Sequence, residues 1–149
     1  MPDSWKAKYI SPMLAVGDME RAIAFYREVL GFKLVRHSPG YSIIERDDRL
    51  IHLKLAWAPD EVMATVRLHT EIYLEVSGIH ALWEHVKQFK DRYQIRDIFD
   101  RKYGMTEFHI RDADNFLIFV GEVTVGEVTV GEATAGEVKS EVKPAPAST

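Results

Sequence analysis

The sequence contains no cysteine, no long apolar segment and no excess of basic residues. Without cysteine, a disulfide framework, a thiolate zinc site and a cysteine nucleophile are excluded, and a reducing compartment is a natural setting. No apolar run approaches the roughly 18 residues that a membrane-spanning helix needs. The first ten residues also lack the apolar core of a secretory signal peptide. We therefore expect a soluble, cytoplasmic protein.

The charged residues do not indicate a nucleic-acid-binding surface. Lys and Arg number 19 against 23 Asp and Glu, which gives a formal net charge of −4, and the two signs are interleaved. A protein that neutralises phosphates presents a basic stripe, which this chain lacks. At 149 residues with 46% hydrophobic side chains, the chain is long enough to bury one substantial core. The sequence predicts one compact domain that binds neither nucleic acid nor membranes.

Two segments sixty residues apart repeat the same pattern. In residues 12–32, a short alternating apolar run leads to Asp18, a favourable helix N-cap, and to an amphipathic helix that ends at Gly31. Residues 72–89 show a second strand, cap and apolar helical stripe, and a shift of 60 superposes the two. We interpret this as an internal duplication. The alternative is two unrelated strand–helix units of ordinary pattern.

Three further strands are predicted after each helix, because an alternation of period two returns there with turn residues between the runs. The six predicted strands cover residues 32–37, 41–46, 49–57, 94–101, 106–111 and 116–122. Each half of the chain is therefore β-α-β-β-β. The predicted fold class is α+β, with two tandem βαβββ modules.

The predicted organisation is one folded domain followed by a repetitive tail. The domain covers residues 1–122, with module one at about 8–57, a linker at 58–67 and module two at about 68–122. The tail begins with four five-residue units of the type GEVTV. An odd period inverts the strand face with each unit, and the repeated glycine weakens a helix. We expect residues 123–149 to be a flexible low-complexity tail; an adhesive β-forming segment is the alternative.

The core motifs resemble those of the vicinal oxygen chelate superfamily, which includes glyoxalase I, extradiol dioxygenases and bleomycin-resistance proteins. They are V-x-D before the first helix, F-Y-x-x-x-L-G-F closing it, and D-x-D-N before the last strand. Asn115 stands where the family commonly has glycine, and asparagine tolerates the positive φ of such a turn. The resemblance covers about residues 8–122. It implies that both modules curl into an open, cup-like mixed sheet, with helices outside and a ligand on the concave face.

Metal-dependent members of this superfamily hold an ion with one side chain from the first and one from the last strand of each module. The resemblance places these positions at Ser11, His52, Glu71 and Phe119. Serine and phenylalanine would leave the coordination of the ion incomplete. We therefore expect vestigial positions, with no metal and no cofactor, and a possible hydrogen bond between His52 and Glu71. The alternative is a divalent metal on those two residues.

Strand parity predicts which side chains line the concave face. The candidate ligand-binding residues are Met13, His52, Lys54, Trp57, Glu71, Tyr73, Glu107, His109 and Phe119. Aromatic surfaces among them can stack a flat ligand, and the carboxylates can meet a cation or an amide donor. As an alternative to ligand binding, Tyr73 and Phe119 serve only to pack the sheet. The alternative for His109 is an ordinary strand histidine with its edge in solvent. No residue is assigned a catalytic role.

The resemblance is nearest in character to the bleomycin-resistance proteins, because the start SPMLAVGD is similar to theirs. It implies a homodimeric small-molecule binding protein that sequesters its ligand in a metal-free crevice, as in antibiotic resistance, without altering it. The alternative is a metal-dependent lyase, isomerase or dioxygenase of the same superfamily. A third class is an interaction module presented by the tail. The sequence does not identify the ligand.

Overall fold

A computed structural model describes residues 2–124 of the chain. Residues 1 and 125–149, which include nearly all of the predicted tail, lie outside the described residues. The elements, in chain order, are β1 (Met13–Val16), α1 (Met19–Leu30), β2 (Lys33–Ser38), β3 (Tyr41–Arg46), β4 (Arg49–Leu55), α2 (Asp60–Leu68), β5 (Glu71–Glu75), α3 (Ile79–Val86), a 3-10 turn (Lys87–Phe89), β6 (Ile95–Asp100), β7 (Met105–Arg111) and β8 (Leu117–Val123). No helix within residues 2–124 is long and apolar enough to cross a membrane.

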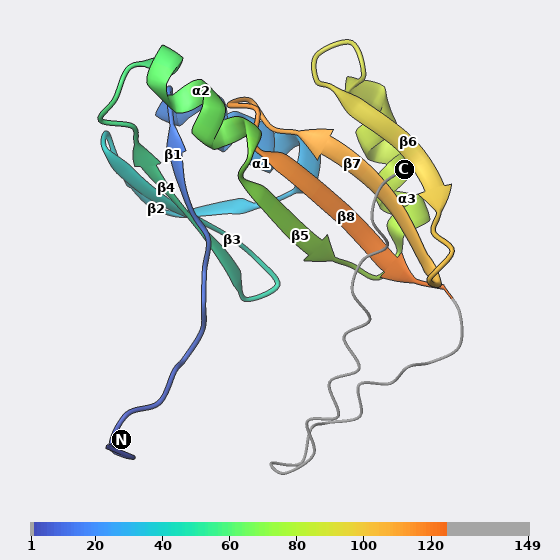
Figure 1. Cartoon of the computed structure of the whole chain (residues 1–149), viewed down its shortest axis with the longest axis horizontal. Coiled ribbons are helices and arrows are strands. Elements are labelled where there is room, and N and C mark those ends of the chain that lie inside the picture. Colours follow the sequence, from blue (N-terminus) through green and yellow to red (C-terminus); the bar gives the residue numbers. More distant parts are fainter. Residues whose placement is uncertain (1, 125–149) are drawn as a thin grey trace.

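The strands form two four-stranded sheets of identical topology. Sheet one has the order β1-β4-β3-β2 and sheet two the order β5-β8-β7-β6. In each sheet the first strand of the module lies parallel to the last, and the other neighbours are antiparallel. Figure 1 shows the sheets side by side, with α1 and α3 behind them. The α+β class and the two βαβββ modules are confirmed; within one chain the strands make two sheets and not one continuous sheet.

The ends of α1 are set by the residues that the sequence indicated. The Asp18 carboxylate accepts a hydrogen bond from the Arg21 amide at 2.8 Å, and Gly31 takes a left-handed conformation with φ of 69° at the C-terminal end. Helix α3 begins differently, since no neighbouring side chain caps it. Instead Glu122, at the end of β8, accepts hydrogen bonds from the amides of Gly78 and the following residue, both at 2.8 Å. The last strand therefore fixes the start of the second module's helix.

The segment expected as a linker, residues 58–67, contains most of helix α2. Arg67 attaches this helix to module one, because its Nε donates to the Ala15 carbonyl at 3.1 Å. Its Nη1 donates at 2.9 Å to Asp60, at the start of the same helix. The guanidinium is almost fully buried. A proline followed by two acidic residues at the helix start was the available sequence signal. The connection between the modules is thus structured.

One hydrophobic core serves both modules. It contains residues from α1, from α3 and from both sheets, packed in a single cluster. At its centre the ring of Phe25 meets Tyr26 edge-on at 5.0 Å and Tyr93, from module two, at 4.8 Å between centroids. Unfolding one module would therefore expose the apolar side chains of the other, so the two modules fold as one unit.

The turn between β7 and β8, residues 112–116, fastens module two to module one; we call it the inter-module turn. Asp114 accepts from the Gly17 amide at 2.8 Å and from Arg21 Nη2 at 3.3 Å. Asp112 accepts from the Tyr26 hydroxyl at 2.6 Å. Both carboxylates are buried. The D-x-D-N motif therefore joins the two halves of the duplication as well as turning the chain.

The same turn confirms the expectation for Asn115, whose φ is 70°. Asparagine is one of the few residues that occupy this left-handed region without a large penalty. The missing glycine is therefore compatible with the turn.

Replacing Asp112 by Asn should change the pH dependence of stability. Burial raises the pKa of this carboxyl from 3.8 to about 6, although hydrogen bonds from Tyr26 and from two backbone amides oppose the rise. Its contribution to folding is therefore complete below pH 4 and is lost as the pH rises through 6. Relative to the parent, Asp112→Asn should gain on the order of 2–3 kcal/mol of unfolding free energy between pH 4 and 7. Urea unfolding at several pH values measures this; a difference that stays flat with pH contradicts it.

Candidate functional site

The face of sheet two that points away from α3 carries one aromatic side chain on each strand. Tyr73 on β5 lies parallel to Phe119 on β8, with centroids 6.5 Å apart; His109 on β7 is 4.2 Å from Phe119, and Phe99 on β6 is 5.3 Å from His109. We call these four residues the aromatic strip. Tyr73 is 51% exposed. The four rings form a row across the sheet: Tyr73 and Phe119 lie within 15° of parallel, whereas His109 is tilted by 57° to Phe119 and Phe99 meets His109 at 79°. The exposed ring of Tyr73 is the part of the strip that suits stacking with a planar ligand.

A buried carboxylate holds the strip in place. Glu107 is 1% exposed and accepts four hydrogen bonds, from Arg101 Nε at 2.7 Å, the Tyr103 hydroxyl at 2.8 Å, His109 Nε2 at 3.2 Å and the Tyr73 hydroxyl at 3.3 Å. Four donors match the acceptor capacity of one carboxylate. Glu107 is therefore saturated by its neighbours, and its role is to fix the positions of the side chains that surround it.

The electrostatics of this cluster leave a single ion pair at neutral pH. Burial alone would raise the pKa of Glu107, but hydrogen bonds from Arg101, His109 and Tyr103 outweigh it and hold the pKa below its usual value. Burial lowers the pKa of His109, so the imidazole is neutral and donates from Nε2 to the carboxylate. Burial and the nearby Glu107 raise the pKa of Tyr73 to about 12. The phenol therefore stays protonated as a hydrogen-bond donor.

The two edges of the strip differ in charge. At the β6 edge the guanidinium groups of Arg96 and Arg101 lie 3.9 Å and 4.9 Å from the centroid of Phe99. At the β5 edge, Glu71 and Glu75 are exposed on either side of Tyr73. A ligand with a flat body and a cationic group is thus complemented at the β5 edge.

The corresponding face of sheet one carries a smaller cluster of residues, Met13, His52 and Lys54, which we call the sheet-one group. His52 pairs in register with Met13, and Lys54 lies two residues further along β4. His52 Nδ1 is hydrogen-bonded to the Tyr41 hydroxyl, so the expected bond between His52 and Glu71 is replaced by a partner within sheet one. Its Nε2 is buried and has no partner within the part of the chain that the structure describes.

The predicted site residues thus fall into two groups on different sheets. Sheet two brings together Tyr73, Glu107, His109 and Phe119, and sheet one carries Met13, His52 and Lys54. Glu71 stands at the exposed start of β5, and Trp57 is 89% exposed in the loop before α2, where it joins neither group.

Sequence reasoning missed the β6 side of the cluster, namely Phe99, Arg101 and Tyr103. The register between β6 and β7 shifts between Arg96 and Phe99. Such an irregularity inverts the side-chain alternation beyond it, so counting by twos along this strand cannot assign a face. An Arg and a Tyr close to a strand glutamate were the only available signal.

Residues 8–120 match the protein-family model of the Glyoxalase/Bleomycin resistance protein/Dioxygenase superfamily. The chain belongs to this superfamily. Similar curated relatives are the bleomycin resistance proteins of Geobacillus stearothermophilus and Staphylococcus aureus, each 30% identical over 119 residues that cover 72% of this chain and 90% of the relative. The resemblance read from the motifs is confirmed.

Solved structures of the superfamily have the same fold. A bleomycin resistance determinant encoded on the transposon Tn5 superposes with a TM-score of 0.63 at 18% identity, covering 78% of this chain and 98% of that one. A glyoxalase-related enzyme from Clostridium phytofermentans superposes with a TM-score of 0.62 at 19% identity, covering 82% and 99%. At such identities the likeness shows the fold alone, so the function must be argued from the site.

The metal-ligand positions of the superfamily do not form a donor set in this chain. Ser11 and His52 lie at sheet one and Glu71 and Phe119 at sheet two, and the phenylalanine carries no donor atom. Among residues 2–124, no group of three or more His, Cys, Asp or Glu side chains is placed to hold a metal ion. Of the four positions, only His52 and Glu71 carry side chains that commonly bind a divalent ion.

Proposed function

We propose that this protein binds a planar small molecule on the aromatic strip of sheet two and sequesters it without breaking a bond. The observation that carries the proposal is the strip itself: four rings on four adjacent strands, locked by Glu107 and open to solvent at Tyr73. Because this surface is already formed, little conformational entropy is lost when a ligand binds. Glu71 and Glu75 at the β5 edge favour a ligand with a cationic group.

The chemistry of the cluster favours binding over catalysis. A general base must reach the proton that it removes, whereas Glu107 is buried and engaged by four donors. Tyr73, with a pKa of about 12, is a poor proton donor near neutrality. Binding in a metal-free crevice is accordingly preferred to the lyase, isomerase or dioxygenase activity of other superfamily members.

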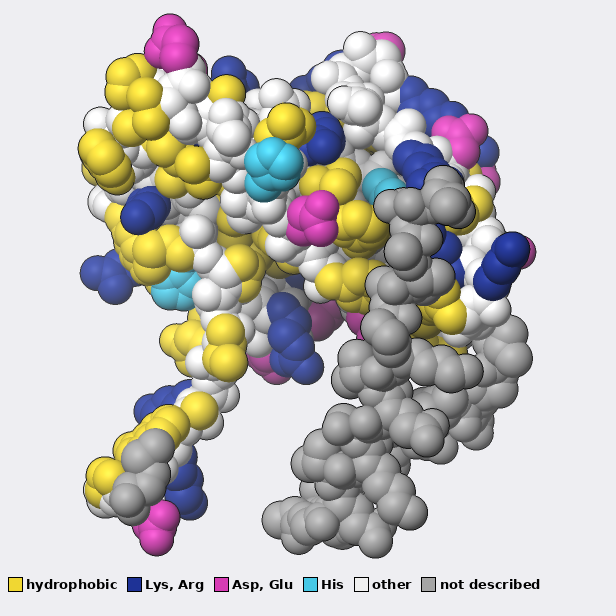
Figure 2. All heavy atoms as spheres, in the orientation of Figure 1, with side chains coloured by type: hydrophobic (Ala, Val, Ile, Leu, Met, Phe, Trp, Pro, Cys, Tyr) yellow, Lys and Arg dark blue, Asp and Glu magenta, His cyan; other side chains and the backbone are white. Residues whose placement is uncertain are grey.

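We further propose that the protein acts as a cytoplasmic homodimer, in which the strip of one protomer faces the sheet-one group of the other. Two observations support this arrangement. The two groups lie on separate sheets of one chain, and residues 2–12 extend away from the body. Figure 2 shows hydrophobic side chains along this extended segment, where Trp5, Tyr9 and Ile10 are exposed. Sedimentation at micromolar concentration should give twice the chain mass.

Titration with bleomycin tests the ligand proposal, because the curated relatives are named for resistance to it. Saturable binding is expected by calorimetry, and Phe119→Ala should weaken the affinity about tenfold or more. Removing a buried aromatic contact costs roughly 1.5–3 kcal/mol, and 1.4 kcal/mol corresponds to tenfold. Val66→Ala, on the exposed face of α2, is the matched control and should leave the affinity unchanged.

Two results would overturn the proposal. One is an affinity for bleomycin and related flat cations that Phe119→Ala leaves unaltered while the variant remains folded by circular dichroism. The other is near-stoichiometric zinc, nickel, iron or manganese in protein purified without chelator, together with turnover that chelators abolish. That second result would support the metal-dependent enzyme.

A further inference from the structure

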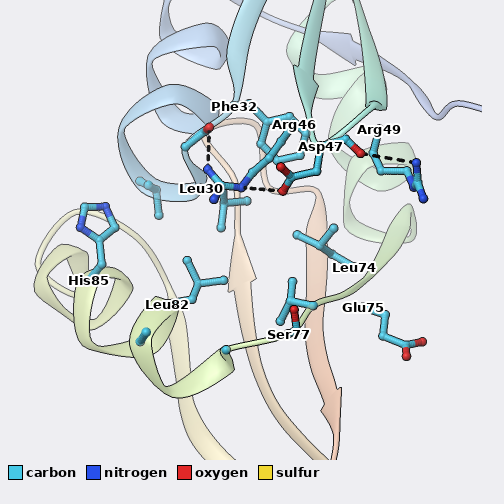
Figure 3. Close-up of a pocket in the computed structure, with 15 residues that line it drawn as sticks. Leu30, Phe32, Arg46, Asp47, Arg49, Leu74, Glu75, Ser77, Leu82 and His85 are labelled. Atoms are coloured by element: carbon cyan, nitrogen blue, oxygen red, sulfur yellow. Dashed lines mark hydrogen bonds and ion pairs between the residues drawn. The ribbon is translucent and has the colours of Figure 1, made fainter. Parts of the chain in front are cut away.

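Gly121 lies in the interior of β8, on the face of sheet two that carries the aromatic strip. It pairs in register with Glu75 on β5 and with Glu107 on β7. Leu74 shows which face this is, because it packs against the core and lines the groove of about 650 Å³ on the helix side (Figure 3). Its neighbours Tyr73 and Glu75 therefore belong to the opposite face. A side chain at residue 121 would lie on that face, beside Glu107.

The backbone of β8 does not require a glycine at this position. Among residues 2–124, the glycines with a positive φ are Gly31, Gly78 and Gly104. Gly121 lies instead within the hydrogen-bonded ladder of the strand. Glycine is unfavourable there, because it loses more conformational entropy on folding than any other residue. A glycine inside a strand often marks a close approach of another group, so we looked for one at Gly121.

The group that approaches Gly121 is the phenol of Tyr73. A Cβ atom at residue 121 would overlap the Tyr73 hydroxyl oxygen, and it would lie 3.1 Å from Cζ of the same ring and 3.2 Å from Cε of Met105. Tyr73 pairs in register with Phe119, so its side chain must cross β8 diagonally to reach Glu107 on β7. It crosses over Gly121, through the volume that any other side chain would fill.

This crossing holds the ring on which the ligand is proposed to stack. The Tyr73 hydroxyl donates to Glu107 Oε1 at 3.3 Å, and the ring lies within 15° of parallel to Phe119. A methyl group at residue 121 would displace the phenol, because the end of a side chain moves more easily than the backbone of a central strand. The displaced ring would lose its hydrogen bond to Glu107 and its fixed orientation.

Gly121 is also the first residue of the repetitive segment, whose units are of the type GEVTV. The next residue, Glu122, accepts hydrogen bonds from the amides of Gly78 and Ile79 at the start of α3. The first glycine and the first glutamate of the repeats therefore each have a specific contact within the fold.

We propose that Gly121 is a positioning residue of the ligand site: because it has no side chain, Tyr73 can lie across β8 in the orientation that stacks the ligand. This inference rests on the proposed function of the aromatic strip. It makes the affinity for the ligand depend on a residue that offers the ligand no side chain of its own. A larger residue at this position should preserve the sheet and disturb the ring.

The first test is the pKa of Tyr73, measured without ligand. Burial and the nearby Glu107 raise the pKa of this phenol to about 12. In Gly121→Ala the displaced phenol is less affected by both, so its pKa should fall toward 10, the ordinary value of tyrosine. The Cζ signals of carbon-13-labelled tyrosine, followed by NMR up to about pH 11, measure the change. The signal missing from Tyr73→Phe identifies Tyr73.

The second test is the affinity for bleomycin, measured by calorimetry. Gly121→Ala should weaken it about threefold to tenfold, because a well-oriented aromatic contact is lost. Gly40→Ala is the matched control: a Cβ atom at this turn of sheet one meets no atom of the described residues within 4 Å. The control should change neither the affinity nor the pKa of Tyr73.

A Tyr73 signal that titrates in Gly121→Ala as it does in the parent would overturn the proposal. An unchanged affinity in a variant whose Tyr73 has moved would overturn it as well. If the parent itself did not bind bleomycin, the proposed function would fail, and the Tyr73 titration would still decide whether Gly121 positions the ring.

A rescue experiment covers the case in which Gly121→Ala does not fold. Tyr73→Ala removes the whole ring and leaves space for the methyl group, so the double variant should fold as Tyr73→Ala does. Met105 needs to shift only slightly, and methionine side chains adapt readily. A double variant that stays unfolded, as judged by circular dichroism, would show that the strand itself needs the glycine, and would overturn the proposal.

Discussion

Glu107→Gln should lower the free energy of unfolding by about 2–3 kcal/mol. The glutamine amide cannot accept four hydrogen bonds, and it leaves the Arg101 guanidinium without its carboxylate at 2.7 Å. Hydrogen bonds to charged groups contribute about 1.5–3 kcal/mol, and breaking a buried pair by removing one member costs more than an exposed one. Urea unfolding at pH 7 measures the change.

The control for this variant is Glu75→Gln, on the same face of sheet two but exposed and without a hydrogen-bond partner among the described residues. Its effect should stay within about 0.5 kcal/mol. Because Glu107 positions Tyr73 and His109, its replacement should also weaken ligand binding to the strip, whereas the control should not. Equal effects of the two substitutions on stability would show that water satisfies the donors as well as Glu107 does.

Asp114→Ala should cost about 3 kcal/mol of unfolding free energy. The substitution removes the acceptor of the Gly17 amide and the partner of Arg21. It also leaves the buried guanidinium of Arg67 with Asp60 as its one carboxylate among the described residues. An uncompensated buried charge and a lost buried hydrogen bond are among the few changes that destabilise a domain to this extent. Denaturant unfolding at pH 7 measures the loss.

Two further variants separate charge from hydrogen bonding at this turn. Asp114→Asn keeps an acceptor for the Gly17 amide and should lose roughly half as much stability as the alanine variant. Asp47→Ala alters the equivalent turn of module one, where the carboxylate is exposed, and should have an effect within about 0.5 kcal/mol. If Asp47→Ala were as costly as Asp114→Ala, the inter-module turn would have no special role in joining the modules.

The elements that the sequence predicted are those whose signals are local. The N-cap at Asp18, the left-handed Gly31 and the alternation along β4, β5 and β8 each depend on neighbouring residues, and each has its counterpart in the structure. The duplication was visible because strand, cap and helix repeat together. The α+β class followed from these local patterns.

The features that were not predictable depend on contacts between distant residues. Helix α2 is held by Arg67, whose Nε donates to the Ala15 carbonyl, a partner far away in the sequence. The partner of His52 is Tyr41, on a neighbouring strand. The resemblance to the superfamily had placed His52 at a metal-ligand position and gave no indication of this contact. A register irregularity in β6 moved Phe99 onto the strip. The predictions for the tail concern residues 125–149, outside the described part of the chain.

The bond between Gly17 and Asp114 joins residues separated by 97 positions. During synthesis, the first helix and its preceding strand therefore leave the ribosome long before their last anchor exists. Loop closure over that span and long-range pairing are slow steps in folding. Module one alone would lack the partners of Gly17, Arg21 and Tyr26, so the two halves, although repeated in sequence, are not independent folding units. The two repeated modules therefore form a single cooperative structure, which is complete only after residue 114 has been synthesised.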